Sequence, residues 1–165
     1  MSTKRSRRIL LAAILVVGGA VLLSGFLRTA LDTTLLLADL AGIDAGWADI
    51  RPPASRRAID YETQAGTRQA DLYLTADTAG AGLVLVPGAA PGGRDDPRLV
   101  TLATALARSG FAVLVPDIES LRELRLSPAT ADEIAAAAVQ LADLDVLPAG
   151  AGLGIGALSV AAGPA

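Results

Sequence analysis

One serine near the end of the chain stands where a nucleophile could be presented. Ser159 follows the apolar run Leu153–Leu158 and precedes the small residues Val160–Ala165. A tight turn between a strand and a helix exposes a serine hydroxyl in such a setting, usually within the pattern Gly-x-Ser-x-Gly. Here Ala157 and Ala161 replace both glycines, and alanine is still small enough for the turn to form. Ser159 is therefore either a candidate nucleophile or an ordinary serine at a strand end.

The glycine-rich loop Pro87–Arg94, with the sequence PGAAPGGR, is a second candidate for chemistry. It lacks the phosphate-binding pattern G-x-x-x-x-G-K-[ST], because Lys4 is the only lysine of the chain, and it lacks G-x-G-x-x-G. Gly152, Gly154 and Gly156 lie close together, but they fall before and within a predicted strand rather than in a turn. The sequence therefore predicts no nucleotide cofactor.

Composition excludes several kinds of site. The 165 residues contain no Cys and no His, which rules out disulfides, zinc sites with His or Cys ligands, Cys nucleophiles and a complete Ser-His-Asp triad within the chain. No metal ion is predicted. The net charge is −3, the pI is about 4.8, and no basic patch follows the first eight residues, so nucleic acid is not a predicted partner.

Three short apolar runs separated by helical patterns predict an α/β fold. The runs are Leu83–Val86, Phe111–Val115 and Leu153–Leu158. Each is expected to be a strand buried on both faces. A helix with Pro97 at its first position, capped by Asp95 or Asp96, follows the first run, and an Ala-rich helix at Thr130–Leu144 follows the second. This order predicts a parallel sheet with right-handed crossovers.

Two further strands are expected before these runs. Ala58–Glu62 and Thr67–Leu74 alternate in polarity, with a turn at residues 64–66 between them. A partial helix or excursion is expected at Glu119–Arg125.

The N-terminus has the pattern of a membrane anchor. Residues 1–8 form a basic tail, and residues 9–27 form an uninterrupted apolar run of about 28 Å at 1.5 Å per residue, close to the thickness of the hydrocarbon core. The run is longer than the apolar part of a secretory signal, so a retained single-pass anchor is favoured over a cleaved signal or a buried core helix. The basic residues before the run predict a cytoplasmic N-terminus and an extracytoplasmic domain.

Residues 28–57 are expected to connect this anchor to a domain at residues 58–165. Thr29–Leu40 has leucines at helical spacing, and this short helix could pack on the domain, lie in the membrane interface or continue the span. Arg51-Pro52-Pro53 then breaks any helix.

Taken in order, these segments resemble the N-terminal half of an α/β-hydrolase, with the dienelactone hydrolase-like branch the most similar. The resemblance covers roughly Ala58 to Ala165. It is carried by Val86–Gly93, Asp95–Arg98, Gly110–Val113 and Val115–Asp117. It implies a mostly parallel sheet with flanking helices and the hydrolysis of a small-molecule ester or related carbonyl compound, with no cofactor.

The resemblance also implies roles for particular residues. Ser159 corresponds to the nucleophile. The backbone N–H groups of Ala89, with Ala90 as the alternative, and of Val160 correspond to the donors that stabilise the developing oxyanion. These three positions, Ser159, Ala89 and Val160, are the predicted site.

The sequence departs from the family pattern in its catalytic acid and base. The acid and the His of the family follow the nucleophile, whereas Asp117 precedes Ser159 and is expected to cap a turn instead. Only six residues follow Ser159. We therefore expect a fragment that is inactive alone and leaves the edge of its last strand uncovered.

Two functions fit these observations. The chain is expected to be the N-terminal portion of a membrane-anchored hydrolase, which the order of loop and serine favours. Alternatively it is a non-catalytic hydrolase-like domain for binding or assembly at the membrane, which the alanines around Ser159 favour. The sequence does not indicate an oligomeric state.

Overall fold

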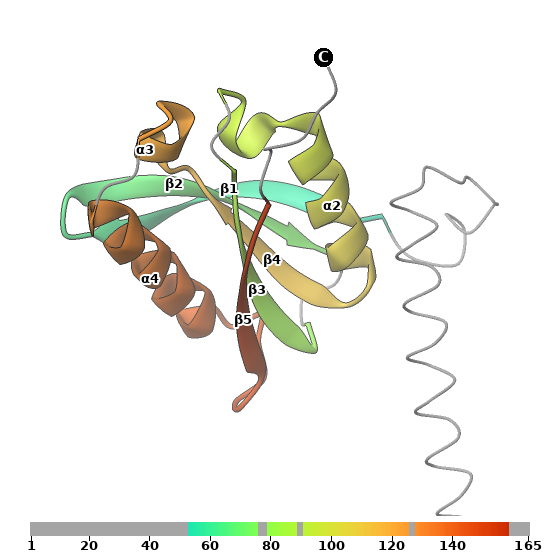
Figure 1. Cartoon of the computed structure of the whole chain (residues 1–165). Coiled ribbons are helices and arrows are strands. Elements are labelled where there is room, and N and C mark those ends of the chain that lie inside the picture. The colour runs from blue at the N-terminus through green and yellow to red at the C-terminus, as the bar shows by residue number, and fades with distance from the viewer. Residues whose placement is uncertain (1–52, 76–78, 89–90, 126–127, 159–165) are drawn as a thin grey trace, which may run out of the picture.

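The computed structural model describes residues 53–75, 79–88, 91–125 and 128–158. These residues form one five-stranded sheet with helices on both faces (Figure 1). The strands are β1 (Ser55–Thr63), β2 (Gly66–Leu74), β3 (Ala81–Val86), β4 (Phe111–Pro116) and β5 (Gly152–Ala157). The helical segments are η2 (Gly93–Asp95), α2 (Pro97–Arg108), α3 (Glu119–Arg122) and α4 (Pro128–Asp143).

The sheet is mixed, with the strand order β1-β2-β4-β3-β5. β3 pairs in parallel with both β4 and β5, whereas β1 pairs antiparallel with β2, and β2 antiparallel with β4. The two strands of the N-terminal hairpin therefore make the sheet less parallel than the sequence predicts. β1 and β2 must be antiparallel because the two-residue turn between Thr63 and Gly66 reverses the direction of the chain.

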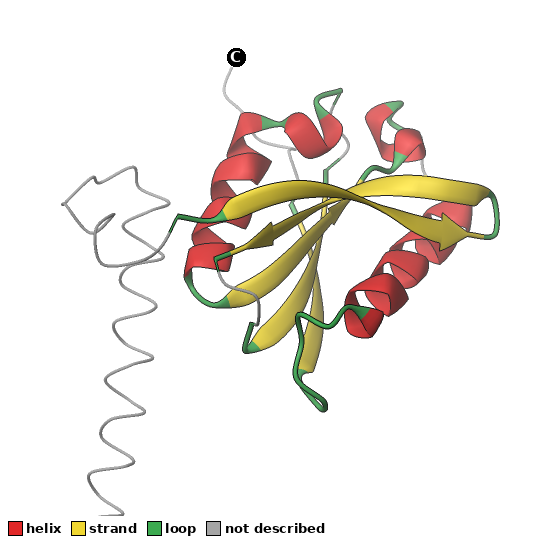
Figure 2. Ribbon diagram, turned by 180° about the vertical axis from the view of Figure 1, so that it is seen from behind, coloured by secondary structure: helices red, strands yellow, loops and turns green. Residues whose placement is uncertain are grey.

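Alternation along the strands produces two apolar layers. Leu72, Val84 and Leu114 face α4, whose Ala137 and Leu141 complete that core. The intervening residues of the same strands face α2 and form a second core. Its buried members are Tyr73, Leu85, Leu99, Ala103, Ala107, Val113 and Val115. α2 and α4 thus lie on opposite faces of the sheet, as Figures 1 and 2 show from two sides.

The structure confirms the predicted start of the first long helix. Pro97 occupies the first turn of α2, and Asp96 caps it, since its Oδ1 accepts a hydrogen bond of 2.9 Å from the Arg98 N–H. The hydrogen bonds from Arg98 also lower the pKa of Asp96. α2 buries Leu99 and Ala103, as its apolar pattern predicts.

β5 differs from its prediction as a strand buried on both faces. It lies at the edge of the described sheet and pairs only with β3. Leu153 is 42% exposed and Ile155 is 59% exposed. The prediction of burial was wrong because it relied on the apolar composition of Leu153–Leu158, and an exposed edge strand can have the same composition. On the covered side, a Cβ at Gly82 would lie 2.7 Å from Leu153 Cδ1, so the missing side chain of Gly82 lets β5 pack against β3.

The predicted anchor, residues 9–27, lies outside the described residues. Among residues 53–158 with the gaps stated above, no helix is both long enough and apolar enough to span a bilayer.

Replacing Leu114 by Ala tests the packing of β4 against α4. Leu114 is 0% exposed, so Leu114→Ala leaves a cavity and is expected to lower the free energy of unfolding by about 2–5 kcal/mol. Val139→Ala, at a position that is 61% exposed, is the control and should change it by less than about 0.5 kcal/mol. Urea unfolding of the full chain, followed by far-UV circular dichroism, measures both. Equal effects of the two variants would contradict the assignment of the core.

Candidate functional site

The carboxyl ends of β3 and β5 lie side by side. Val86 is the register partner of Ala157, and the Leu158 N–H donates a hydrogen bond of 3.2 Å to the Val86 carbonyl. Beyond its end, β3 leads through η2 to α2 on one face of the sheet. Ligands of open α/β sheets bind outside the carboxyl ends of the strands, where neighbouring connections diverge. This edge is therefore the candidate site.

The predicted site residues adjoin this edge but lie outside the described residues. Ser159 is the next residue after Leu158, and Ala89 is the next residue after Gly88. Val160 and the alternative donor Ala90 are outside as well. The structure places the ends of β3 and β5, the strands that precede these residues in the sequence. The roles of Ser159, Ala89 and Val160 stay predictions.

Asp117 follows β4 directly, and its predicted role as a turn cap stays a prediction. Its backbone N–H donates a hydrogen bond of 2.8 Å to the Gln69 carbonyl, which continues the pairing of β4 with β2. Its Oδ1 lies 3.4 Å from Arg122 Nε in α3. Asp117 thus secures the connection that follows β4.

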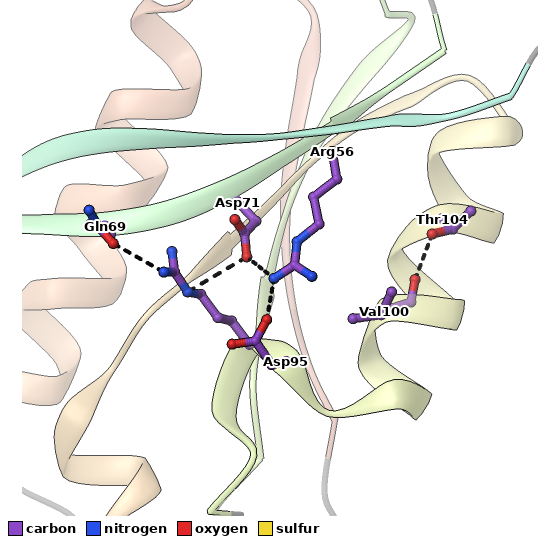
Figure 3. A network of polar contacts seen from close by, with 7 residues as sticks. Arg56, Gln69, Asp71, Asp95, Val100 and Thr104 are labelled. Atoms are coloured by element: carbon purple, nitrogen blue, oxygen red, sulfur yellow. Dashed lines mark hydrogen bonds and ion pairs between the residues drawn. The ribbon is translucent and has the colours of Figure 1, made fainter.

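A cluster of four charged side chains lies on the α2 side of the sheet, next to the loop after β3. Arg56 of β1 lies 2.6 Å from Asp71 Oδ2 and 2.5 Å from Asp95 Oδ1, both measured from Nη2 (Figure 3). Arg94 Nε lies 3.7 Å from the same oxygen of Asp71, and Arg94 Nη2 donates to Gln69 Oε1 at 3.0 Å. We call Arg56, Asp71, Arg94 and Asp95 the ionic cluster.

Asp71 is the buried centre of the ionic cluster. It is 4% exposed, and an isolated carboxylate at such a position would be costly to bury. Arg56 and Arg94 approach it from two different elements and supply the opposite charge. The Arg56 hydrogen bond lowers the pKa of Asp95, and the hydrogen bonds to Asp71 and Asp95 raise the pKa of Arg56.

Tyr73 lies beside the ionic cluster, and Tyr61 lies in the core that faces α4. The Arg56 guanidinium lies 5.8 Å from the centre of the Tyr73 ring, within the range of a cation–π contact. Burial raises the pKa of Tyr73, and it raises the pKa of Tyr61 to about 12 on the other face. In both cases burial favours the protonated phenol.

A second contact joins the connections after β3 and β4. Gly93 has a φ of +50° and is buried, and a Cβ there would lie 2.7 Å from Arg122 Cδ. The stem of Arg122 therefore lies against the backbone of η2, while its Nε reaches Asp117. The left-handed backbone angle favours glycine, and a side chain here would require the stem of Arg122 to shift.

Sequence analysis missed the ionic cluster. A usable signal exists, because Asp71 lies between Ala70 and Leu72 in an apolar strand, on the face opposite to them. A charged residue at an inward position needs a partner. The identity of the partners could not be predicted, since Arg56 and Arg94 come from separate elements.

The described residues contain no group of three or more Asp and Glu side chains that could hold a metal ion.

Comparison with known proteins shows the fold. No protein-family model and no curated protein matches the sequence. Among solved structures, a dienelactone hydrolase-like promiscuous phosphotriesterase from metagenomic libraries matches with a TM-score of 0.50 and 22% identity, over 63% of this chain and 49% of that one. The esterase of the hyperthermophilic archaeon Pyrobaculum calidifontis matches with a TM-score of 0.54 and 18% identity, over 79% of this chain and 43% of that one.

These likenesses confirm the predicted resemblance at the level of fold. The chain shares the α/β fold of esterases and of a dienelactone hydrolase-like enzyme. It spans less than half the length of either structure.

Replacing Asp71 tests whether the ionic cluster holds the segment after β3. Asp71→Ala removes the carboxylate that Arg56 and Arg94 share, and a loss of about 1–3 kcal/mol in the free energy of unfolding is expected. Faster amide hydrogen exchange in residues 91–96 should accompany this loss. Asp60→Ala, at an exposed position of β1, is the matched control and should change neither quantity. Unchanged exchange in Asp71→Ala would show that the cluster does not hold this segment.

Proposed function

We propose that the chain carries the nucleophile and the oxyanion-binding part of a serine hydrolase that acts on esters or related carbonyl compounds. The observation that carries this proposal is the adjacency of the β3 and β5 ends, since Leu158 bonds to Val86 directly before Ser159. A nucleophile after one strand and oxyanion donors after its neighbour could both reach one substrate carbonyl. The esterase and the phosphotriesterase that share the fold support hydrolysis as the reaction class.

The proposed reaction proceeds in two steps. Ser159 Oγ forms a bond to the carbonyl carbon while a base takes its proton, and the backbone N–H groups of Ala89 and Val160 stabilise the negative oxygen. Collapse of this intermediate breaks the bond to the alcohol, which leaves with the proton from the base. Water then attacks the acyl-serine in the same way and releases the acid.

The base must come from outside these 165 residues, because they include no His. The same observation favours the alternative function, a non-catalytic hydrolase-like domain for binding or assembly. The two proposals differ in whether a His and an acid join Ser159.

The proposed location is a membrane surface. Lys4, Arg5, Arg7 and Arg8 precede the apolar residues 9–27, which supports a single-pass anchor with a cytoplasmic N-terminus. The sheet domain would then lie on the extracytoplasmic side and meet small-molecule substrates there.

Fluorophosphonate labelling tests the catalytic proposal. The chain extended through the codons that follow Ala165 should be labelled, with the label on Ser159, and Ser159→Ala should abolish it. The 165-residue chain should stay unlabelled and show no esterase turnover, because it has no base. Ser55→Ala, whose hydroxyl bonds to the Leu74 carbonyl, is the control and should be labelled like the parent.

Two results would refute the catalytic proposal and favour the binding domain. One is an extended chain that stays unlabelled while a control esterase reacts. The other is a stop codon directly after Ala165, which would leave the protein without a His. Esterase activity of the 165-residue chain that depends on Ser159 would overturn the requirement for an external base.

Alkaline carbonate extraction tests the anchor. The full chain, produced in a bacterial host, should stay with the membranes, because peripheral contacts are broken at high pH and a spanning helix is not. Deleting residues 1–27 should release the protein to the supernatant. Replacing the four basic residues of the tail by Ser is the control, since it should weaken the orientation rather than the insertion. Release of the intact chain by carbonate would contradict the anchor.

A further inference from the structure

Leu124, in the connection after β4, has a backbone conformation that its residue type disfavours. Its φ is +58°, and among the described residues it is the only one other than glycine with a positive φ. In this left-handed conformation the Cβ of an L-residue lies too close to the following carbonyl oxygen, whereas glycine has no such contact. Glycine would therefore be the less costly residue at this position.

The end of α3 imposes this conformation. The Arg125 N–H donates a hydrogen bond of 2.8 Å to the Ser120 carbonyl, and the Leu124 N–H donates one of 3.1 Å to the Leu121 carbonyl. This pair of bonds is the Schellman ending of a helix, in which the left-handed residue is usually glycine. Leu121 is buried in the core that faces α4 and holds α3 in place. The angle at Leu124 thus follows from hydrogen bonds within residues 120–125, all of which the structure describes.

The Leu124 side chain makes little contact with the part of the fold that the structure describes. It is 67% exposed, more than any other large hydrophobic side chain among the described residues. It belongs to neither apolar core. Glycine would remove the unfavourable angle at little cost in packing. Unfavourable backbone conformations cluster at functional sites, which points to a ligand as the partner of this side chain.

Leu124 lies at the same edge of the sheet as the candidate site. α3 follows the carboxyl end of β4, and β4 pairs in parallel with β3. The stem of Arg122 in α3 contacts the backbone at Gly93 of η2, which connects β3 to α2. Figure 1 shows α3 and the start of α2 at one end of the sheet. Leu124 therefore borders the edge at which a substrate would bind.

The charged residues around Leu124 are paired with one another. Glu123 Oε2 accepts a hydrogen bond from Arg125 Nη2, and Arg122 Nε lies 3.4 Å from Asp117 Oδ1. These four side chains carry no net charge, and opposite charges held together attract a distant charge only weakly. The group that this surface suits best is therefore apolar.

We propose that Leu124 determines specificity by contacting the alkyl chain of an ester substrate. The inference rests on the proposed hydrolysis at Ser159, and it names the substrate class for that site as esters with an extended alkyl chain. Each methylene group that moves from water onto an apolar side chain stabilises the complex. The contact therefore favours long chains over short ones. Leucine at this position supplies an apolar side chain that the less costly glycine lacks.

Urea unfolding tests whether Leu124 serves the fold instead. The chain extended through the codons that follow Ala165 is compared with its Leu124→Gly and Leu124→Ala variants. Leu124→Gly should unfold at a higher urea concentration, because it relieves the unfavourable angle, and Leu124→Ala should not, because it keeps a Cβ. A midpoint of Leu124→Gly that is no higher than that of the parent would show that the side chain contributes to packing, and it would overturn the proposal.

Fluorophosphonates of two chain lengths test the contact with substrate. The labelling rate constant of an octyl reagent, divided by that of an ethyl reagent, should fall about four- to fifteenfold in both variants, the equivalent of one or two buried methylene groups. The rate with the ethyl reagent should be unchanged. Leu124→Met, with an apolar side chain of similar volume, should keep the parental ratio. Val139→Ala, at a position of α4 that is 61% exposed, is the matched control and should keep it too.

The outcomes separate this inference from the proposed function. A parent chain that is labelled, with an unchanged ratio in Leu124→Gly, would overturn the contact and leave hydrolysis at Ser159 intact. A parent chain that neither reagent labels would refute the proposed function, and the role of Leu124 in substrate recognition would fall with it.

Discussion

The pairing of β3 with two parallel neighbours constrains the rest of the molecule. β3 is hydrogen-bonded to β4 on one side and β5 on the other, and both of its faces are covered by apolar residues. The crossover from β3 to β4 through α2 and the crossover from β4 to β5 through α4 run in opposite directions along the sheet. If both are right-handed, their helices must lie on opposite faces. α2 therefore lies on one face and α4 on the other. The adjacency of the β3 and β5 ends follows directly from this arrangement.

The ionic cluster solves a problem that the sheet creates. Extending the sheet with the hairpin places Asp71 on an inward face, where a lone carboxylate would oppose folding. Arg56 from the hairpin and Arg94 from η2 offset that cost. Arg56 also contacts Asp95, which connects the segment after β3 to β1, the first strand of the sheet. Bonds to charged groups depend on both partners, so the loop and the hairpin are expected to be stable together or not at all.

Local patterns predicted most of the elements, because each depends on neighbouring residues. The cap at Asp96, the apolar face of α2 and the alternation of β2 follow from spacing alone, and all three are confirmed. The edge position of β5 was expected, but the exposure of the Leu153 and Ile155 side chains on its face was not, since burial depends on what covers the sheet. The ionic cluster was missed for the same reason, because Arg56 and Arg94 are far apart in sequence. The predicted residues Ser159, Ala89 and Val160 lie outside the described residues. The fold places the strand ends that precede Ser159 and Ala89 side by side, and the roles of the three residues stay predictions.

The contact of Gly93 with Arg122 has a consequence for how this edge can change during evolution. Connections after strands usually vary independently, and this freedom lets one sheet acquire new specificities. Here a side chain at position 93 would displace Arg122 from Asp117, so an altered first connection would disturb the second. A substitution at Gly93 would therefore require Arg122 to move as well, so the connections after β3 and β4 are expected to change together rather than one at a time.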